Sequence, residues 1–160
     1  MQTYDMVVIG SGPSGRRSAI QAAKLGRSVL VVDKGRRLGG VSVHTGTIPS
    51  KTLRETALNL SDWRERGFYG RSYRVKKEIE GKDLGARLRM TLDHEINVLE
   101  HQFARNGVKT LAGRARFLDP HTLAVANAEE ETKITGDKIV IAVGTSPYRP
   151  ANIPFNDTSV

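Results

Sequence analysis

The sequence has no cysteine among its 160 residues. This absence excludes disulfide bonds, thiolate metal ligands and thiol redox chemistry within the chain. Aromatic residues make up only 6% of the sequence, and no apolar stretch approaches the roughly 20 residues that a membrane-spanning helix needs. The N-terminus also lacks the basic start and apolar core of a secretory signal peptide. We therefore expect a cytoplasmic protein without a membrane segment.

Acidic residues are fewer than basic ones, 17 against 25, and the formal net charge is +8. A charge of this sign favours an anionic partner, such as a nucleotide, a nucleic acid or an acidic protein. The charges are interleaved, however, as in the run Arg64, Glu65 and Arg66, which is typical of an ordinary solvated surface. Because no nucleic-acid recognition motif accompanies them, we expect no nucleic-acid partner.

The N-terminal residues follow the pattern of a strand, a glycine turn, a helix and a second strand. Short apolar runs at 5–10 and 28–33 are typical of strands buried on both faces of a parallel sheet. Between them, small and apolar residues at helical spacing predict a helix over 13–25, with Gly26 as its C-terminal cap. A right-handed crossover is the expected connection, and the fold class it predicts is α/β.

The middle of the chain predicts two further helices. After a loop over 34–46, Pro49 fits the first position of a helix. Residues 63–82 show no periodicity, so we expect an irregular surface segment. Asp83 is then a candidate N-cap for a long amphipathic helix that ends near Asn106.

The last part of the chain predicts short strands. We expect a small antiparallel meander from four pieces, at 108–112, 115–118, 122–126 and 132–135. Residues 138–144 repeat the character of the first strand and are predicted to rejoin the parallel sheet. Residues 1–147 then form one domain of parallel sheet, crossover helices and β-meander, and the proline-containing segment 148–160 is typical of a linker.

Residues 10–15 match the motif G-x-G-x-x-G. Glycines at this spacing allow a tight turn, close approach of the backbone to a pyrophosphate, and close packing of helix on strand. The helix that follows directs its N-terminal dipole and free N–H groups at the phosphates. Asp33, at the end of the second predicted strand, can accept hydrogen bonds from an adenosine ribose. A plain strand-to-helix turn is the structural alternative, but the combined context predicts a dinucleotide site.

A second glycine-rich segment, over residues 39–51, reads G-G-V-S-V-H-T-G-T-I-P-S-K. It resembles the segment that carries the two redox cysteines in the FAD-dependent pyridine nucleotide–disulfide oxidoreductases. Ser42 and Thr47 hold the places of those cysteines. Within that family, the run G-T-I-P-S-K is similar to that of the soluble pyridine nucleotide transhydrogenases. The resemblance extends over essentially the whole chain, including residues 113–122 and 139–145.

The resemblance implies a Rossmann-like FAD-binding domain. The residues it implies at the cofactor are Gly10, Gly12, Pro13, Ser14, Gly15, Asp33, Lys34, Gly39, Gly40, Ser42, Thr47, Lys51, Ala115, Ala142 and Gly144. The first glycine segment would pack against the pyrophosphate, Asp33 would hold the ribose, and Lys51 would lie beside the flavin. Arg16 and Arg17 depart from the small residues that the family usually has after the third glycine.

The missing sulfur bears on the activity that the resemblance implies. Serine and threonine hydroxyls cannot accept the electron pair that a disulfide reductase passes from flavin to cystine. Hydride exchange between a nicotinamide and the flavin remains available. The full-length protein is therefore expected to be an FAD-dependent NAD(P) transhydrogenase that moves hydride from NADPH to NAD.

The sequence has no second G-x-G-x-x-G. We therefore expect the N-terminal part of a larger flavoprotein, homodimeric when full length, whose 160-residue part is inactive alone. Two alternatives stay open: a non-catalytic FAD- or ADP-binding module, and a relative of dihydrolipoamide dehydrogenase that has lost its disulfide.

The four histidines provide no convincing catalytic group. His44 lies near the expected flavin, but an exposed loop position is favoured over a hydrogen bond to the cofactor. His94, His101 and His121 are interpreted as structural. We expect no metal site and no catalytic side chain from this chain.

Overall fold

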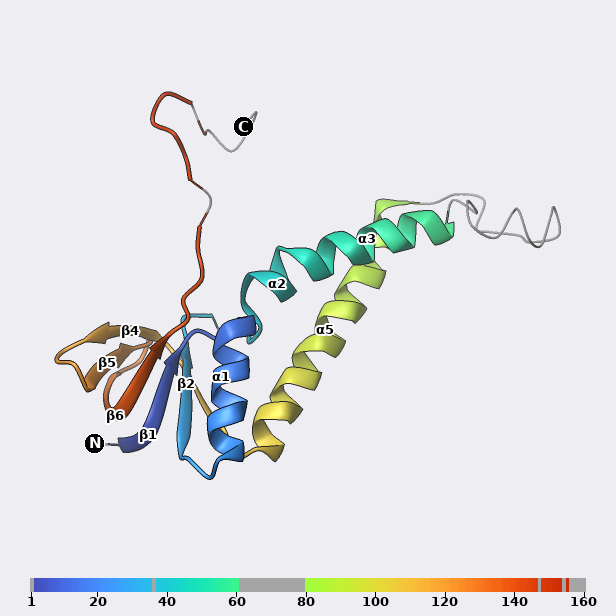
Figure 1. Cartoon of the computed structure of the whole chain (residues 1–160). Coiled ribbons are helices and arrows are strands. Elements are labelled where there is room, and N and C mark those ends of the chain that lie inside the picture. Colours follow the sequence, from blue (N-terminus) through green and yellow to red (C-terminus); the bar gives the residue numbers. More distant parts are fainter. Residues whose placement is uncertain (1, 36, 61–79, 147, 154, 156–160) are drawn as a thin grey trace.

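The computed structural model of the chain describes residues 2–35, 37–60, 80–146, 148–153 and 155 (Figure 1). Its elements are β1 (Gln2–Ile9), α1 (Pro13–Lys24), β2 (Val29–Asp33), α2 (Gly40–His44), α3 (Thr47–Leu60), α5 (Gly81–Arg105), β3 (Lys109–Ala112), β4 (Arg114–Phe117), β5 (Thr122–Ala126) and β6 (Glu131–Ile141). The strands form one six-stranded sheet in the order β3-β2-β1-β6-β5-β4. Most of the segment predicted to be irregular, 63–82, lies outside the described residues.

The parallel half of the sheet is built around β1 and β2. β1 pairs in parallel with β2 and with β6, and β2 pairs in parallel with β3. Four consecutive residues of β2, 29–32, are buried, as expected of a strand covered on both faces. On one face Val31 packs with Ala19 of α1 and Phe103 of α5, and on the other Leu30 packs with residues of β5 and β6. The predicted α/β fold is confirmed.

Two strand predictions are wrong. The pattern places 108–112 in the antiparallel meander, but β3 pairs in parallel with β2 at the edge of the sheet. The pattern also predicts separate strands on either side of Gly136, whereas β6 runs through that residue without a break. A Cβ at Gly136 would lie 2.8 Å from Cγ2 of Val7, so glycine allows close packing there rather than a turn. The meander is therefore β4, β5 and the first half of β6.

The first of the two helical segments starts earlier than the pattern predicts. A short helix, α2, begins at Gly40 inside the predicted loop. α3 begins at Thr47, so Pro49 is its third residue and not its first. Proline is tolerated there because the first-turn N–H groups have no acceptor within the helix. The glycine-rich loop is therefore shorter than expected, and it leads directly into helix.

The long helix α5 also begins earlier than predicted, at Gly81. Glu80 is its N-cap, and Asp83 is the third residue of the helix. The Asp83 carboxylate accepts the N–H of Glu80 at 3.0 Å, which forms a capping box. The predicted end of the helix is confirmed, because Arg105 is its last residue and Asn106 its C-cap.

The helices α3 and α5 pack side by side and extend beyond the sheet (Figure 1). Near the sheet, Val43 of α2 packs with Ile96 and Leu99 of α5, and Ile48 of α3 joins this cluster. The cluster fixes the start of α2 against the body of the domain. Among the described helices, none is long and apolar enough to span a membrane.

Candidate dinucleotide-binding site

The turn from β1 to α1 depends on two glycines for its own packing. Gly10 has a φ of +105°, a left-handed conformation that residues with a Cβ rarely adopt. A Cβ at Gly10 would also lie 2.3 Å from the carbonyl oxygen of Ala142. A Cβ at Gly15 would lie 1.9 Å from the carbonyl oxygen of Gly10. A side chain at Gly10 would push the turn away from the end of β6, and a side chain at Gly15 would push α1 away from the turn.

Gly12, the middle glycine, is different. Its φ of −62° and ψ of 180° suit any residue, and a Cβ there would meet no heavy atom of the described chain within 4 Å. The packing of the polypeptide therefore does not require glycine at this position. What a glycine provides here is room for a group that approaches from outside the chain, which is the role of this position against a pyrophosphate.

The N-terminus of α1 is open to an anion. Gly12 is the N-cap, and in the described part of the chain no side chain caps the helix. The first turn also has no acidic residue. The unpaired N–H groups of a first turn and the positive end of the helix dipole together favour bound phosphate. Pro13 and Ser14 are exposed in this turn.

The second glycine-rich loop lies against the first. Gly39 and Gly40 have φ values of +117° and +62°. A Cβ at Gly40 would lie 2.9 Å from Cα of Gly12, so the two backbones touch at this point. Ser42, two residues further on, donates its hydroxyl hydrogen to the carbonyl oxygen of Gly39 at 3.1 Å. The contact between the two loops thus brings together four predicted site residues, Gly12, Gly39, Gly40 and Ser42.

Asp33, at the carboxyl end of β2, accepts hydrogen bonds from two segments. Its Oδ2 accepts the N–H of Ser11 at 2.7 Å and the Ser11 hydroxyl at 2.5 Å, and its Oδ1 accepts the N–H of Gly35 at 2.9 Å. A carboxylate has about four lone-pair positions, so Oδ1 keeps the capacity to accept a ribose hydroxyl. The acidic side chain therefore lies beside the glycine turn, as the motif requires.

The residues that follow β6 also lie against the glycine turn. The N–H of Ala142 donates to the carbonyl oxygen of Ile9 at 2.8 Å, which continues the pairing of β6 with β1. Gly144 follows with a φ of +70°, and no described atom would meet a Cβ there within 4 Å. Ala142 thus adjoins Gly10, and Gly144 faces open space.

The structure does not bring the remaining predicted residues to the turn. Lys34 is exposed after β2. Thr47 and Lys51 are exposed on α3. A helix starting at Pro49, as predicted, would have Lys51 in its first turn, but Lys51 is the fifth residue of α3 and lies beyond that turn. Ala115 is half-buried in β4, opposite Val125 of β5. Within the described residues, no hydrogen bond or ion pair joins these four to the glycine turn.

His44 is not the exposed loop residue that the pattern favours. It is the last residue of α2 and is half-buried. Its Nε2 lies 3.2 Å from the carbonyl oxygen of Arg37 and 3.0 Å from that of Leu38, so a proton on Nε2 can be donated to either. The guanidinium of Arg37 forms an ion pair with Asp93 of α5. These contacts anchor the segment that leads into Gly39.

The other histidines lie away from the turn. His94 and His101 are exposed on α5, and Nδ1 of His121 lies 3.1 Å from the carbonyl oxygen of Gly136. Among the residues that the structure describes, no cluster of three or more histidine, aspartate or glutamate side chains could hold a metal ion.

Ser11 is a site residue that the motif does not reveal. It occupies a position of G-x-G-x-x-G that accepts any residue, so its spacing carries no signal. In the structure it is 1% exposed, and its hydroxyl oxygen contacts both Asp33 and the N–H of Gly39. Only the fold shows that this serine lies between three segments.

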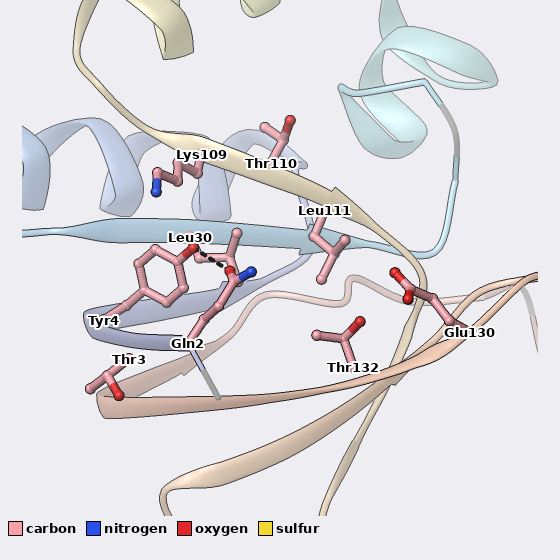
Figure 2. A pocket seen from close by; sticks show the side chains of 9 residues that line it. All are labelled: Gln2, Thr3, Tyr4, Leu30, Lys109, Thr110, Leu111, Glu130 and Thr132. Carbon is pink, nitrogen blue, oxygen red and sulfur yellow. Dashed lines mark hydrogen bonds between the residues drawn. The ribbon is translucent and has the colours of Figure 1, made fainter.

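A separate pocket of about 540 Å³ lies at the other end of the strands (Figure 2). It is lined by Gln2, Thr3, Tyr4, Leu30, Lys109, Thr110, Leu111, Glu130 and Thr132. The Tyr4 hydroxyl donates to Oε1 of Gln2 at 2.9 Å, and Nζ of Lys109 lies 5.7 Å from the Tyr4 ring centroid. Ligands of parallel α/β sheets bind at the carboxyl ends of the strands. The glycine turn, and not this pocket, is therefore the candidate site.

Comparison with known proteins identifies the family. The sequence profile of the family "Pyridine nucleotide-disulphide oxidoreductase" matches residues 4–159. Soluble pyridine nucleotide transhydrogenases from Mycobacterium bovis and Mycobacterium tuberculosis are each 51% identical to the whole of this chain. The one from Chromohalobacter salexigens is 36% identical over 97% of it. The chain spans 35%, 35% and 34% of the lengths of these three relatives.

Solved structures show the same fold. The HOCl-induced flavoprotein disulfide reductase RclA from Escherichia coli superimposes with a TM-score of 0.74 at 25% identity, over 92% of this chain and 30% of that one. Its Cu(II) complex gives a TM-score of 0.75 at 25% identity, over 94% and 31% of the two chains. From the profile match over residues 4–159, the chain belongs to the pyridine nucleotide-disulphide oxidoreductase family.

Proposed function

We propose that this chain is the FAD-binding portion of a flavoprotein oxidoreductase. The observation that carries the proposal is Gly12, where glycine is not required by the chain and where a Cβ would fill the space beside an open helix N-terminus. Gly40 of the second loop packs against Cα of Gly12, and Asp33 is hydrogen-bonded to Ser11, the residue before Gly12. These groups fit the pyrophosphate and the adenosine ribose of a dinucleotide.

The proposal gives roles to the other predicted residues. The backbones of Gly12 and Gly40 and the N–H groups of α1 hold the pyrophosphate, and Oδ1 of Asp33 accepts a ribose hydroxyl. The remaining members line the cofactor along its length, with Ala115 at the adenine and Thr47 and Lys51 toward the flavin. The full set is Gly10, Gly12, Pro13, Ser14, Gly15, Asp33, Lys34, Gly39, Gly40, Ser42, Thr47, Lys51, Ala115, Ala142 and Gly144.

For the full-length protein we propose FAD-dependent hydride transfer between NADPH and NAD. The relatives that are 51% identical are named as soluble pyridine nucleotide transhydrogenases. Bound FAD would supply the hydride chemistry, and the residues of this chain would position it and exclude water. Ser42 and Thr47 provide no thiol, so this segment does not pass electrons to a disulfide.

The proposal assigns the rest of the reaction to other parts of the full-length protein. The chain spans about a third of those proteins. Residues 1–147 would be the N-terminal part of the FAD-binding domain, and 148–160 would lead into an NAD(P)-binding domain. A homodimer and a cytoplasmic location belong to the same proposal for the full-length protein.

A non-catalytic FAD- or ADP-binding module is the second candidate. The hydroxyl side chains at positions 42 and 47 favour it, because they remove the family's thiol chemistry from this segment. A relative of dihydrolipoamide dehydrogenase without its disulfide would share these features. The two enzymes bind FAD, the module binds FAD or ADP, and the three differ in what the full-length protein does with reduced nicotinamides.

Two measurements test the proposal. The purified 160-residue chain should take up FAD and show the absorption bands of bound flavin, but it should transfer no hydride from NADPH to an NAD analogue. The protein from the complete reading frame should carry out that transfer. A full-length protein that binds FAD but transfers no hydride would support one of the two alternatives, and a chain that takes up neither added FAD nor added ADP would contradict all three.

A further inference from the structure

Two serine–aspartate pairs join β1 to β2, one at each end of the two strands. At the carboxyl end, the N–H and hydroxyl of Ser11 donate to Oδ2 of Asp33 at 2.7 and 2.5 Å. At the amino end, the N–H and hydroxyl of Ser28 donate to Oδ2 of Asp5 at 2.7 and 2.6 Å. In both pairs the serine oxygen accepts a backbone N–H at 2.9 Å. The two pairs therefore have the same hydrogen-bond pattern.

They differ in what they connect. The N–H that Ser28 accepts belongs to Asp5, so that pair closes on itself at an exposed position. The N–H that Ser11 accepts belongs to Gly39, in the second glycine-rich loop. Ser11 therefore links the glycine turn, the end of β2 and the second loop, and it does so from a buried position.

We propose that Ser11 is a positioning residue for the dinucleotide site, an inference that rests on the proposed function. Its hydroxyl has one hydrogen, which goes to Asp33, and its oxygen accepts from Gly39, so one small group fixes both. With Oδ2 occupied in this way, Oδ1 is the carboxylate oxygen left for a ribose hydroxyl.

The second loop has little freedom to compensate for a lost bond. A Cβ at Gly39 would lie 2.5 Å from Cγ2 of Val43 and 3.1 Å from Cδ1 of Leu99, so the backbone there is packed tightly on α2 and α5. Without the Ser11 hydroxyl, the buried N–H of Gly39 has no acceptor unless the loop shifts. A shift would move Gly40 away from Gly12, where the pyrophosphate is expected.

The test compares Ser11→Ala with Ser28→Ala, which removes the same set of bonds at the far end of the strands. Calorimetric titration with ADP should show affinity reduced about tenfold or more in Ser11→Ala and little changed in Ser28→Ala. With 2′,3′-dideoxy-ADP, which has no ribose hydroxyls for Asp33, the loss in Ser11→Ala should be smaller. Equal losses for both nucleotides, or none, would overturn the proposal.

A second measurement needs no ligand. In the 160-residue chain, the amide hydrogen of Gly39 should exchange slowly in the wild type and in Ser28→Ala, and much faster in Ser11→Ala. If Gly39 exchanges at the same rate in all three proteins, Ser11 does not hold the loop and the proposal is wrong. A wild-type chain that binds no ADP but shows the expected exchange would contradict the proposed function, and it would still show that Ser11 holds the second loop.

Discussion

A Cβ at Gly10 or Gly15 would overlap neighbouring backbone, whereas among the described residues no heavy atom lies within 4 Å of a Cβ built at Gly12. The structure thus separates the two glycines that shape the turn from the one that leaves room beside it. Asp33 and Ser11 complete this group, because their hydrogen bonds tie the turn to β2 and to the second loop. The chemistry of the candidate site therefore comes mainly from backbone and from two small polar side chains.

Asp5 provides a residue-scale prediction that is independent of any ligand. The hydroxyl of Ser28 and then its N–H hold the pKa of the Asp5 carboxyl below its ordinary value of 3.8, and the charge of Arg27 adds to this effect. A carboxyl whose pKa is lower in the folded chain than in the unfolded chain stabilises the fold at pH values above its unfolded-state pKa. This stabilisation is lost as the pH falls through the folded-state pKa.

Ser28→Ala should therefore raise the pKa of Asp5 toward 3.8. The variant should be less stable than the wild type near neutral pH, and the difference should shrink as the pH falls below about 4. NMR titration of the Asp5 carboxyl carbon and thermal unfolding across this range would measure both effects. An unchanged Asp5 pKa in the variant would show that Ser28 does not control it.

At the residue scale, the motifs predict the glycines and Asp33 because their roles follow from spacing. They do not predict Ser11, whose role depends on a loop that begins beyond β2. They also misplace Lys51 relative to the first turn of α3, since the prediction starts that helix at Pro49 and the structure starts it at Thr47.

At the scale of elements, the same substitution should have opposite effects in α5 and α1. Gly85 lies inside α5, and a Cβ there would make only an ordinary contact, 3.7 Å from Nη1 of Arg89. Gly85→Ala should stabilise the chain by about 0.5–1 kcal/mol, because alanine loses less conformational entropy in a helix. Gly15→Ala should destabilise it by about 1–3 kcal/mol, because its Cβ overlaps the Gly10 carbonyl.

Urea unfolding of both variants measures these changes. The comparison is internally controlled, since each variant adds one methyl group to a helical glycine. A destabilised Gly85→Ala would mean that α5 is not helical at that point, and a neutral Gly15→Ala would mean that α1 does not pack against the turn as closely as described.

Whether a segment is a helix or a strand was easier to predict than which strand it pairs with. The buried strands, the helix after the turn and the end of α5 follow from local periodicity and capping. Local periodicity does not predict the partner of β3, because β3 pairs with β2, and the helices α2, α3 and α5 separate these two strands in the sequence. The continuity of β6 through Gly136 depends likewise on contact with Val7, which lies at the other end of the chain.

At the scale of the whole molecule, the parallel half of the sheet packs one face against α1 and α5 and the other against residues of β5 and β6. The helices α3 and α5 extend beyond this body, and the glycine turn lies where α2 meets it (Figure 1). The family and the fold were predictable from two glycine-rich segments. The proposed activity stays a prediction, because this chain spans about a third of the lengths of the relatives it matches.

The most direct test of the central claim is the FAD affinity of the wild-type chain compared with that of Gly12→Ser. Serine is a preferred N-cap, and no described atom opposes its Cβ, so the variant should be at least as stable as the wild type. Its side chain would occupy the open space at the start of α1 and would cap the N–H groups that are expected to bind the pyrophosphate. The account predicts a dissociation constant raised about tenfold or more at unchanged stability; equal affinity in the two proteins would contradict it.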